Sequence, residues 1–351
     1  MDESKNPLLI VSVTLAVLLV ARWIIRTRTM DGPTKKPLYR VDHSVLNIPL
    51  PLQSLWMNMG YWKDTDDFPT ACRALLEQVL KHAHILPDEV SEKSTNPNGN
   101  QSLSIIDLGY GCGDQSLYIR DTFSQSAQND PQNTKQTHLK AYIGLTLEPS
   151  HFATAQKRLD STTLSTPHTA PFTIFCADAA NPSSWTPQIH TAISHASQPP
   201  NDPAHPHHLW ILALDTLYHF QPSRWPVLHY ASTTLNASLM AFDLCTADTL
   251  SLWQRIVIRF LTFMGQSPAA NWVTVSEYRD RLVEAGYARD KIAIHDISEF
   301  VFGPLHGFME KRGRELEELG MSIGRFRYAG GMFGWWGRSG VVRACVVVAR
   351  K

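Results

Sequence analysis

The sequence predicts an α/β fold: a mostly parallel, doubly wound sheet with helices on both faces, preceded by an N-terminal transmembrane helix. Two observations predict the sheet. From Leu103 onward, short apolar segments alternate with segments of helical spacing. The first apolar segment also ends in a glycine-rich loop, and ligands of such sheets bind at the carboxyl ends of strands. A third observation, the apolar segment 8–25, predicts the transmembrane helix.

Composition narrows the possible partners. The 351 residues include 32 Lys plus Arg and 32 Asp plus Glu, so the net charge is zero. A general nucleic-acid binder is usually basic, so we expect no nucleic-acid partner. The five cysteines are scattered without a C-x-x-C pair, which argues against a disulfide framework or a zinc site and fits a reducing compartment. We predict no metal site.

Residues 8–25 are long enough to cross a bilayer core if Arg22 reaches the interface. The downstream flank is basic, and the positive-inside rule then places the chain after this segment in the cytosol. We therefore expect an uncleaved membrane anchor at 1–28, followed by a linker at 29–45. A cleaved signal peptide is the alternative, and the basic flank argues against it. The expected location is a membrane, that of the endoplasmic reticulum if the cell is eukaryotic.

Between the linker and the sheet, the sequence predicts a docking region at 46–100. Residues 46–63 are rich in aromatic and apolar groups but include prolines, which favours an irregular segment. Residues 68–82 have apolar side chains at helical spacing and predict a helix. Residues 88–101 are polar and rich in Asn and Ser, which predicts a loop.

The remaining elements follow in chain order. Predicted strands are 103–108, 140–145, 172–176, 209–214, 238–244, 291–295 and 341–349. Predicted helices are 115–123, 150–159, 226–235, 250–264 and 296–319. Polar insertions are expected at 124–137 and 192–208, and an aromatic, glycine-rich piece at 324–337. Residues 250–337 together are predicted to form a lid over a substrate.

The loop at 107–113 reads D-x-G-x-G-x-G, with Asp107 followed by Gly109, Gly111 and Gly113. Glycines let backbone amides approach a ligand closely and tolerate positive φ. The spacing differs from the dinucleotide and phosphate-loop motifs. It resembles the first motif of class I S-adenosylmethionine-dependent methyltransferases, whose loop holds the methionine end of the cofactor. A glycine-rich turn without a ligand is the alternative.

Residues 142–159 resemble the second strand and helix of the tocopherol, sterol and cyclopropane-fatty-acid branch of that superfamily. The resemblance implies that Thr146, Leu147 and Glu148 lie at the cofactor ribose. Thr146 stands where most members have an acid, so Glu148 or His151 could supply the contact. A helix-capping Thr and a surface Glu are the alternative.

Residues 175–179 also match the family, with Asp178 and Ala179 implied at the adenine; an Asp that caps a helix is the alternative. Residues 213–220 resemble the segment after the fourth strand, which faces the transferring methyl group. Leu214 is then a cofactor contact, and Asp215, Tyr218 and His219 are the catalytic candidates. His219 has a pKa suited to proton transfer, although it could equally be a core histidine.

The segment 56–62 resembles the piece that precedes the cofactor domain in the same branch. The resemblance implies that Tyr61 and Trp62 close over the cofactor, because aromatic faces attract a sulfonium cation. Ordinary hydrophobic packing is the alternative.

The resemblance implies one methyltransferase domain at 46–351, with a seven-stranded, Rossmann-like sheet that ends in an antiparallel hairpin. The expected cofactor is S-adenosyl-L-methionine, and the expected reaction is in-line SN2 transfer of its methyl group. Apolar side chains in the lid favour a hydrophobic small molecule or lipid as the acceptor through O, N or C. The alternatives are a cofactor-binding protein that transfers nothing, such as a scaffold or cyclase, or a protein methyltransferase.

Overall fold

The computed structural model describes residues 52–87, 101–129, 137–162, 170–199, 206–264 and 267–351. The described residues of Leu50–Arg314 and Ile323–Lys351 form one compact unit, which contains the sheet. The predicted anchor at 1–28 and linker at 29–45 lie outside the described residues. Among the helices that the structure does describe, none is long and apolar enough to cross a membrane.

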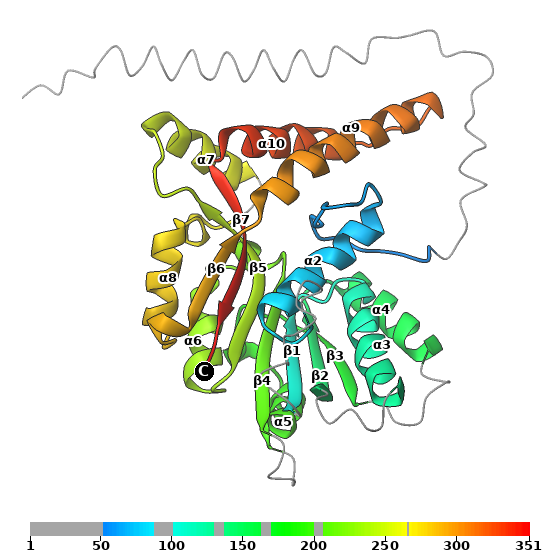
Figure 1. Ribbon diagram of the computed structural model, residues 1–351, viewed down its shortest axis with the longest axis vertical. Helices are drawn as coiled ribbons and strands as arrows, with labels where there is room; N and C mark the ends of the chain where they lie inside the picture. Colours follow the sequence, from blue (N-terminus) through cyan, green and yellow to red (C-terminus); the bar gives the residue numbers. More distant parts are fainter. Residues whose placement is uncertain (1–51, 88–100, 130–136, 163–169, 200–205, 265–266) are drawn as a thin grey trace, which may run out of the picture. The chain divides into compact units, whose positions relative to one another are not determined.

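Seven strands form one sheet in the order β3-β2-β1-β4-β5-β7-β6 (Figure 1). The strands are β1 Gln101–Leu108, β2 Thr137–Thr146, β3 Phe172–Cys176, β4 His207–Leu214, β5 Ser238–Thr246, β6 Ile292–Asp296 and β7 Val342–Ala349. Only β7 runs antiparallel to its neighbours, β5 and β6. The predicted seven-stranded, mostly parallel sheet is confirmed. Its order reverses between β1 and β4, which is where ligands bind in such sheets.

Helices cover both faces of the sheet (Figure 1). One face carries α2 Phe68–His82, α3 Asp114–Asn129 and α4 Pro149–Thr162, and the other carries α5 Pro187–Ser197, α6 Trp225–Thr233 and α8 Val275–Glu284. Because side chains alternate along a strand, neighbouring residues serve opposite cores. Ile105 packs in the first core and Ile106 in the second. Strands β1, β4, β5 and β7 are therefore buried along most of their length on both faces.

Several predicted boundaries differ from the structure. The helix at 68–82 and the strand at 172–176 match, whereas α3 continues into the predicted insertion at 124–137. The insertion predicted at 192–208 is wrong at both ends, because α5 reaches Ser197 and β4 begins at His207. Pro187 starts α5, and its apolar residues Ile189 and Ile193 are buried in the second core. Those contacts stabilise a helix in a segment whose polar sequence had predicted an insertion.

Two helices of the lid region were not predicted. Helix α8 starts with a capping box in which Thr274 and Glu277 bond each other's backbone, a signal present in the sequence. Helix α10 Phe326–Ser339 includes four glycines, which disfavour a helix by about 1 kcal/mol each. Burial of Phe333 and Trp336 against the sheet offsets that cost. Helix α9 Phe302–Glu318 begins later than predicted, after the 3₁₀ turn Ser298–Phe300.

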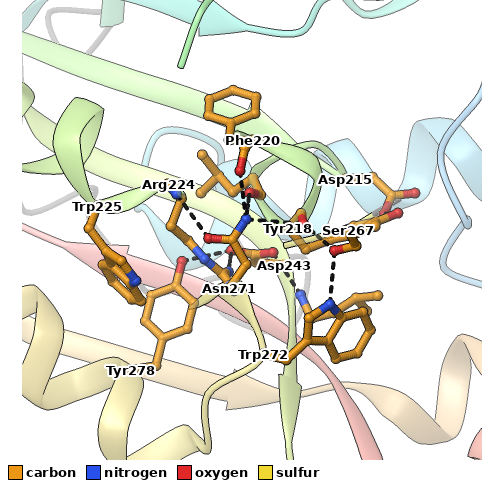
Figure 2. Close-up of polar contacts among 12 residues, drawn as sticks. Asp215, Tyr218, Phe220, Arg224, Trp225, Asp243, Ser267, Asn271, Trp272 and Tyr278 are labelled. Carbon is orange, nitrogen blue, oxygen red and sulfur yellow. Dashed lines mark hydrogen bonds and ion pairs between the residues drawn. The ribbon is translucent and has the colours of Figure 1, made fainter. Parts of the chain in front are cut away.

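A fully buried ion pair joins the sheet to the helices behind it (Figure 2). Arg224, just before α6, donates through Nη1 to Oδ2 of Asp243 in β5, and both side chains have no exposed surface. The hydroxyl of Tyr278 in α8 donates to the same oxygen at 2.8 Å. The other oxygen, Oδ1, accepts from the Leu244 backbone N–H at 2.8 Å. Each buried ion costs several kcal/mol of desolvation, and these contacts offset part of it, because Nε and Nη2 of Arg224 have no hydrogen-bond partner among the described residues.

The network continues to the loop after β4 through Asn271, which is also fully buried. Its Oδ1 accepts from the Arg224 backbone N–H at 2.9 Å, and its amide nitrogen donates to the carbonyls of Phe220 (2.8 Å) and Tyr218 (3.2 Å). The Ser267 hydroxyl donates to the same Tyr218 carbonyl (Figure 2). These contacts position the loop at 215–220.

We expect Asp243→Ala to lower the free energy of unfolding by about 3–5 kcal/mol, because it leaves the buried Arg224 without its counter-ion. Glu284→Ala is the matched control, since it removes the exposed partner of Arg281 and should cost about 0.5 kcal/mol or less. Urea unfolding measures both. A loss below about 1 kcal/mol in Asp243→Ala would contradict a structural role for this ion pair.

Candidate active site

The glycine loop leaves β1 in a backbone conformation that other residues rarely adopt. Gly109, Gly111 and Gly113 have φ values of 110°, 61° and 93°. A Cβ on Gly109 would lie 2.4 Å from Cγ2 of Thr216, and one on Gly113 would lie 3.0 Å from Cβ of Ala155. Both positions therefore require glycine for conformation and for space.

A cavity of about 360 Å³ lies beside this loop, at the carboxyl ends of β1 and β4. We call it the loop cavity. Its walls come from the glycine loop, the start of α3, the loop after β4 and the docking segment. The lining residues are Leu55, Trp56, Met57, Asn58, Gly109, Tyr110, Gly111, Cys112, Asp114, Gln115, His151, Leu214, Asp215, Thr216, Tyr218 and His219. Such a volume suits a small organic ligand.

Asp107 is the last polar residue of β1 and is fully buried. Its Oδ2 accepts from the Tyr142 hydroxyl at 2.5 Å and from the Gln115 side chain at 2.6 Å. Burial raises its pKa from an ordinary 3.8 to about 7, against the opposing effect of both hydrogen bonds. Its Oδ1 has no hydrogen-bond partner among the described residues. One acceptor beside the glycine loop is thus left unsatisfied.

Asp215 lies in the wall of the loop cavity, just after β4, with a φ of 63°. Its carboxylate accepts from the Met59 backbone N–H at 2.8 Å and from the Tyr218 hydroxyl at 2.9 Å. Burial raises its pKa to about 7, and the two hydrogen bonds act in the opposite direction. The positive φ of a non-glycine residue is a strained conformation of the kind that clusters at functional sites.

The docking segment is held against the loop cavity by a partly buried ion pair. Arg158 in α4 donates to both carboxylate oxygens of Asp114 in α3, at 2.6 and 2.9 Å. The same carboxylate accepts from the Leu55 backbone N–H at 3.2 Å. Arg158 also donates to the Gln53 carbonyl at 3.2 Å. Bidentate arginine–carboxylate pairs fix geometry well, so this pair places Leu55–Asn58 at the cavity.

Tyr61 and Trp62 lie further along the docking segment and do not line the loop cavity. Trp62 is buried, with its ring 5.0 Å from that of Phe308, and its Nε1 donates to the Met59 carbonyl at 2.8 Å. Tyr61 packs on Phe300 at 5.1 Å. This packing of Trp62 fits the alternative considered from the sequence, and a place for Tyr61 and Trp62 over the cofactor stays a prediction. Residues Trp56 and Met57 line the cavity instead.

The residues predicted at the ribose and adenine stand at the carboxyl ends of β2 and β3. Thr146 is buried, and its carbonyl accepts from the Ala177 N–H at 2.8 Å, whereas Leu147 and Glu148 are exposed. None of the three lines the loop cavity. His151, the other ribose candidate, does line it. A cofactor role for Thr146, Leu147 and Glu148 stays a prediction.

The Asp178 side chain accepts from the Ala180 backbone N–H at 2.9 Å and so caps the turn that follows β3. Ala179, the next residue, is buried. Both residues follow β3, and neither lines the loop cavity. Their adenine role also stays a prediction. Gly113 and Asp107 likewise support the loop without lining the cavity.

A second cavity, of about 210 Å³, shares Tyr218 and His219 with the first. We call it the apolar cavity. It is enclosed by α7 Leu252–Met264, α10 and the ends of β5 and β7. The other lining residues are Met59, Leu244, Ile258, Thr262, Ser267, Trp272, Met332, Phe333, Trp336 and Val342. Most are hydrophobic, and the Trp336 indole nitrogen has no hydrogen-bond partner among the described residues.

Tyr218 and His219 form the wall between the cavities, with ring centroids 4.2 Å apart. The Tyr218 hydroxyl is held by Asp215 at 2.9 Å, and its backbone carbonyl by Ser267 and Asn271. The pKa of His219 is lowered, because desolvation by the surrounding protein outweighs the attraction of Asp243. His219 is therefore neutral near pH 7 and can accept a proton.

Reasoning from the sequence missed several residues of the site. Asp114 and Gln115 directly follow the glycine motif, so their place at the start of a helix was a usable signal. Trp56–Asn58 lie within the segment 56–62 that was singled out. Ser267 and Asn271 carried no signal, because only packing brings them to the loop at 215–220.

We expect the raised pKa of Asp107 to make stability depend on pH. Between about pH 4 and pH 7 the folded protein holds a proton that the unfolded chain has lost. Stability therefore falls as pH rises through this range, by on the order of 3–4 kcal/mol from this group.

Asp107→Asn should remove that slope. The test is the urea midpoint of both proteins at pH 5 and at pH 7.5, where the difference between them isolates Asp107 from other titrating groups. Parallel losses in wild type and variant would refute a proton on Asp107.

No protein-family model matches the sequence, and no curated protein matches it. Solved structures do match. A cyclopropane synthase from Mycobacterium tuberculosis has 14% identity and a TM-score of 0.52, with 84% of this chain and 90% of that chain covered. A mycolic acid cyclopropane synthase complexed with SAH and CTAB has 10% identity and a TM-score of 0.53, with 84% and 90% covered.

A putative sarcosine dimethylglycine methyltransferase from Galdieria sulphuraria has 12% identity and a TM-score of 0.53, with 84% of this chain and 93% of that chain covered. At such identities the likeness concerns the fold alone, and it agrees with the strand order and with the glycine loop after β1. The chain has the fold of the class I S-adenosylmethionine-dependent methyltransferases.

Proposed function

We propose that the protein transfers a methyl group from S-adenosyl-L-methionine to a hydrophobic small molecule or lipid. The observation that carries this proposal is the meeting of two unlike cavities at Tyr218 and His219. The loop cavity has glycine backbone and carboxylates in its walls. The apolar cavity offers room for a hydrophobic acceptor on the other side of the same two side chains.

The residues of the loop cavity fit the cofactor. Side chains at Gly109 and Gly113 would collide with Thr216 and Ala155, so glycine keeps the loop in this conformation, in which Gly109 and Gly111 line the cavity. The unpartnered oxygen of Asp107 lies at the base of the loop, and the carboxylate of Asp215 lies in the cavity wall. Carboxylates and the rings of Trp56 and Tyr218 favour a ligand that carries ammonium and sulfonium charges.

The bound cofactor supplies a methyl group that is already activated by its sulfonium, so the protein mainly has to align the acceptor and exclude water. Tyr218, oriented by Asp215, and His219 separate the two cavities. For an oxygen or nitrogen acceptor, the neutral imidazole of His219 can take the departing proton. The indole N–H of Trp336 has no hydrogen-bond acceptor among the described residues and can donate to an oxygen atom on the substrate.

The comparisons support this choice of ligands in one respect. The mycolic acid cyclopropane synthase in the comparison was solved with SAH and CTAB. Its fold matches this chain over 84% of the residues. For location, we propose a single-pass membrane protein whose methyltransferase domain faces the cytosol, on the evidence of residues 8–25 and the basic residues after them.

Full-length protein in mild detergent should bind S-adenosylhomocysteine with a Kd on the order of micromolar, the range of a well-formed small-molecule site. Gly111→Val should abolish binding, because Gly111 has a positive φ, lines the loop cavity and is already close to Met57. Isothermal calorimetry measures both.

Gly307→Val is the control for that variant, since a Cβ there meets nothing within 4 Å. It should bind S-adenosylhomocysteine as tightly as the wild type. Unchanged affinity in Gly111→Val would place the cofactor elsewhere, and no binding by the wild type would refute the proposed function.

His219→Ala should lower methyl transfer to an oxygen or nitrogen acceptor by roughly 10²–10⁴-fold. Its affinity for S-adenosylhomocysteine should change little, because the glycine loop remains intact. The assay incubates protein and methyl-labelled donor with a lipid extract and counts label in the organic phase. If the wild-type protein binds the donor but labels no compound in any extract, the protein binds the cofactor and transfers nothing.

A further inference from the structure

Helix α7 has two faces with different surroundings. Ile258 and Thr262 point to the apolar cavity. On the opposite side lie Leu252, Ile256 and Phe260, spaced by four residues, with Trp253 beside them. These four side chains are 48% to 77% exposed. We call them the outer stripe. Large apolar side chains that are about half exposed or more and line up over more than two helical turns are unusual on a monomeric soluble surface.

The two charged residues within α7 are both positive. Between Asp248 and Glu277 the only charged residues are Arg255 and Arg259. Both are exposed, both lie along one edge of the stripe, and neither forms an ion pair with a described residue. The whole chain is electrically neutral, so this is a local surplus.

Helix α10 repeats the pattern next to α7, with which it encloses the apolar cavity (Figure 1). Phe326 and Tyr328, at its start, are 54% and 49% exposed, and Arg325 precedes them. No acidic residue follows Glu318 to the end of the chain. Two neighbouring helices thus combine exposed large apolar groups with arginines and lack acidic groups.

We propose that the outer stripe of α7, together with the start of α10, docks on an anionic lipid bilayer. A helix with an exposed apolar face and an arginine edge is suited to lie in the interface plane, with its apolar side chains among the acyl chains. Arg255 and Arg259 then face the lipid phosphates, which their charge complements. The docked surface is the outside of the same helix whose inner face lines the apolar cavity.

One consequence rests on the proposed function. A lipid or lipophilic acceptor that leaves the bilayer at α7 would enter the apolar cavity without crossing water. The docking itself is independent of methyl transfer, because the outer stripe shares no residue with the loop cavity. Variants of the stripe should therefore keep their affinity for S-adenosylhomocysteine, which separates failure of docking from failure of the proposed function.

The test must report on α7 locally, because residues 8–25 are themselves predicted to enter a bilayer. Full-length protein is placed in nanodiscs of phosphatidylcholine alone or with about 30% phosphatidylserine. Hydrogen exchange is then followed at the amides of 252–260 by mass spectrometry. We expect slower exchange in the anionic nanodiscs, since each arginine near the surface strengthens attachment roughly fivefold.

Arg255→Gln/Arg259→Gln should remove the difference between the two lipid compositions. Ile256→Glu/Phe260→Glu should remove protection in both, and these exposed positions can change without disturbing the fold. Arg281→Gln/Arg289→Gln is the matched control, because it removes two exposed positive charges from another part of the chain and should behave as wild type.

Equal exchange of 252–260 in both compositions, or unchanged protection in Arg255→Gln/Arg259→Gln, would overturn the proposal. Protection that appears in detergent and grows with protein concentration would assign the stripe to contact between two copies of the chain. That result would also overturn docking on lipid.

Discussion

The buried pair of Arg224 and Asp243 is the constraint on which the site depends. Two charges without any exposed surface cost several kcal/mol of desolvation each, and the contact between them offsets part of that cost. Asp243 belongs to β5, Arg224 precedes α6, and Tyr278 belongs to α8, so the pair sets three elements relative to one another. Asn271 then extends the same network to the backbone of Tyr218 and Phe220. A loop that would otherwise be free is held where both cavities meet.

A second constraint acts from the other side of the loop at 215–220. Thr216 donates to the Leu108 carbonyl at 2.8 Å and fills the space that a side chain at Gly109 would need. The ends of β1 and β4 are thereby joined at the reversal point of the sheet, next to Asp215 and its strained backbone. Burial of Asp107 and Asp215 raises the pKa of both groups to about 7. The site thus combines two carboxyl groups close to their titration point with a neutral imidazole, the proposed base.

An element could be predicted from the sequence when residues close together in the chain, and not contacts with distant residues, stabilise it. Strand β3 and helix α2 were predicted to the residue, because a short, mostly apolar segment and helical spacing are properties of the chain itself. Helix α10 was not, since its glycines disfavour a helix and its stability comes from contacts of Phe333 and Trp336 with distant residues. The packing of Trp62 on Phe308 was not predictable for the same reason. An aromatic residue near a site is equally suited to cover a ligand or to pack on another side chain.

The sequence by itself determined the seven strands in their chain order, the glycine loop after β1 and the choice of Asp215, Tyr218 and His219 as candidates, because these depend on local pattern and residue type. Only the tertiary structure decided which residues line the cavities. His151, Asp114 and Trp56 reach the loop cavity from three different segments, whereas Glu148 and Asp178 stand apart from it. The buried network through Asn271 was equally beyond the sequence. Hydrogen bonds between residues about 50 positions apart leave no periodic trace in the chain, and they form only once the sheet brings the partners together.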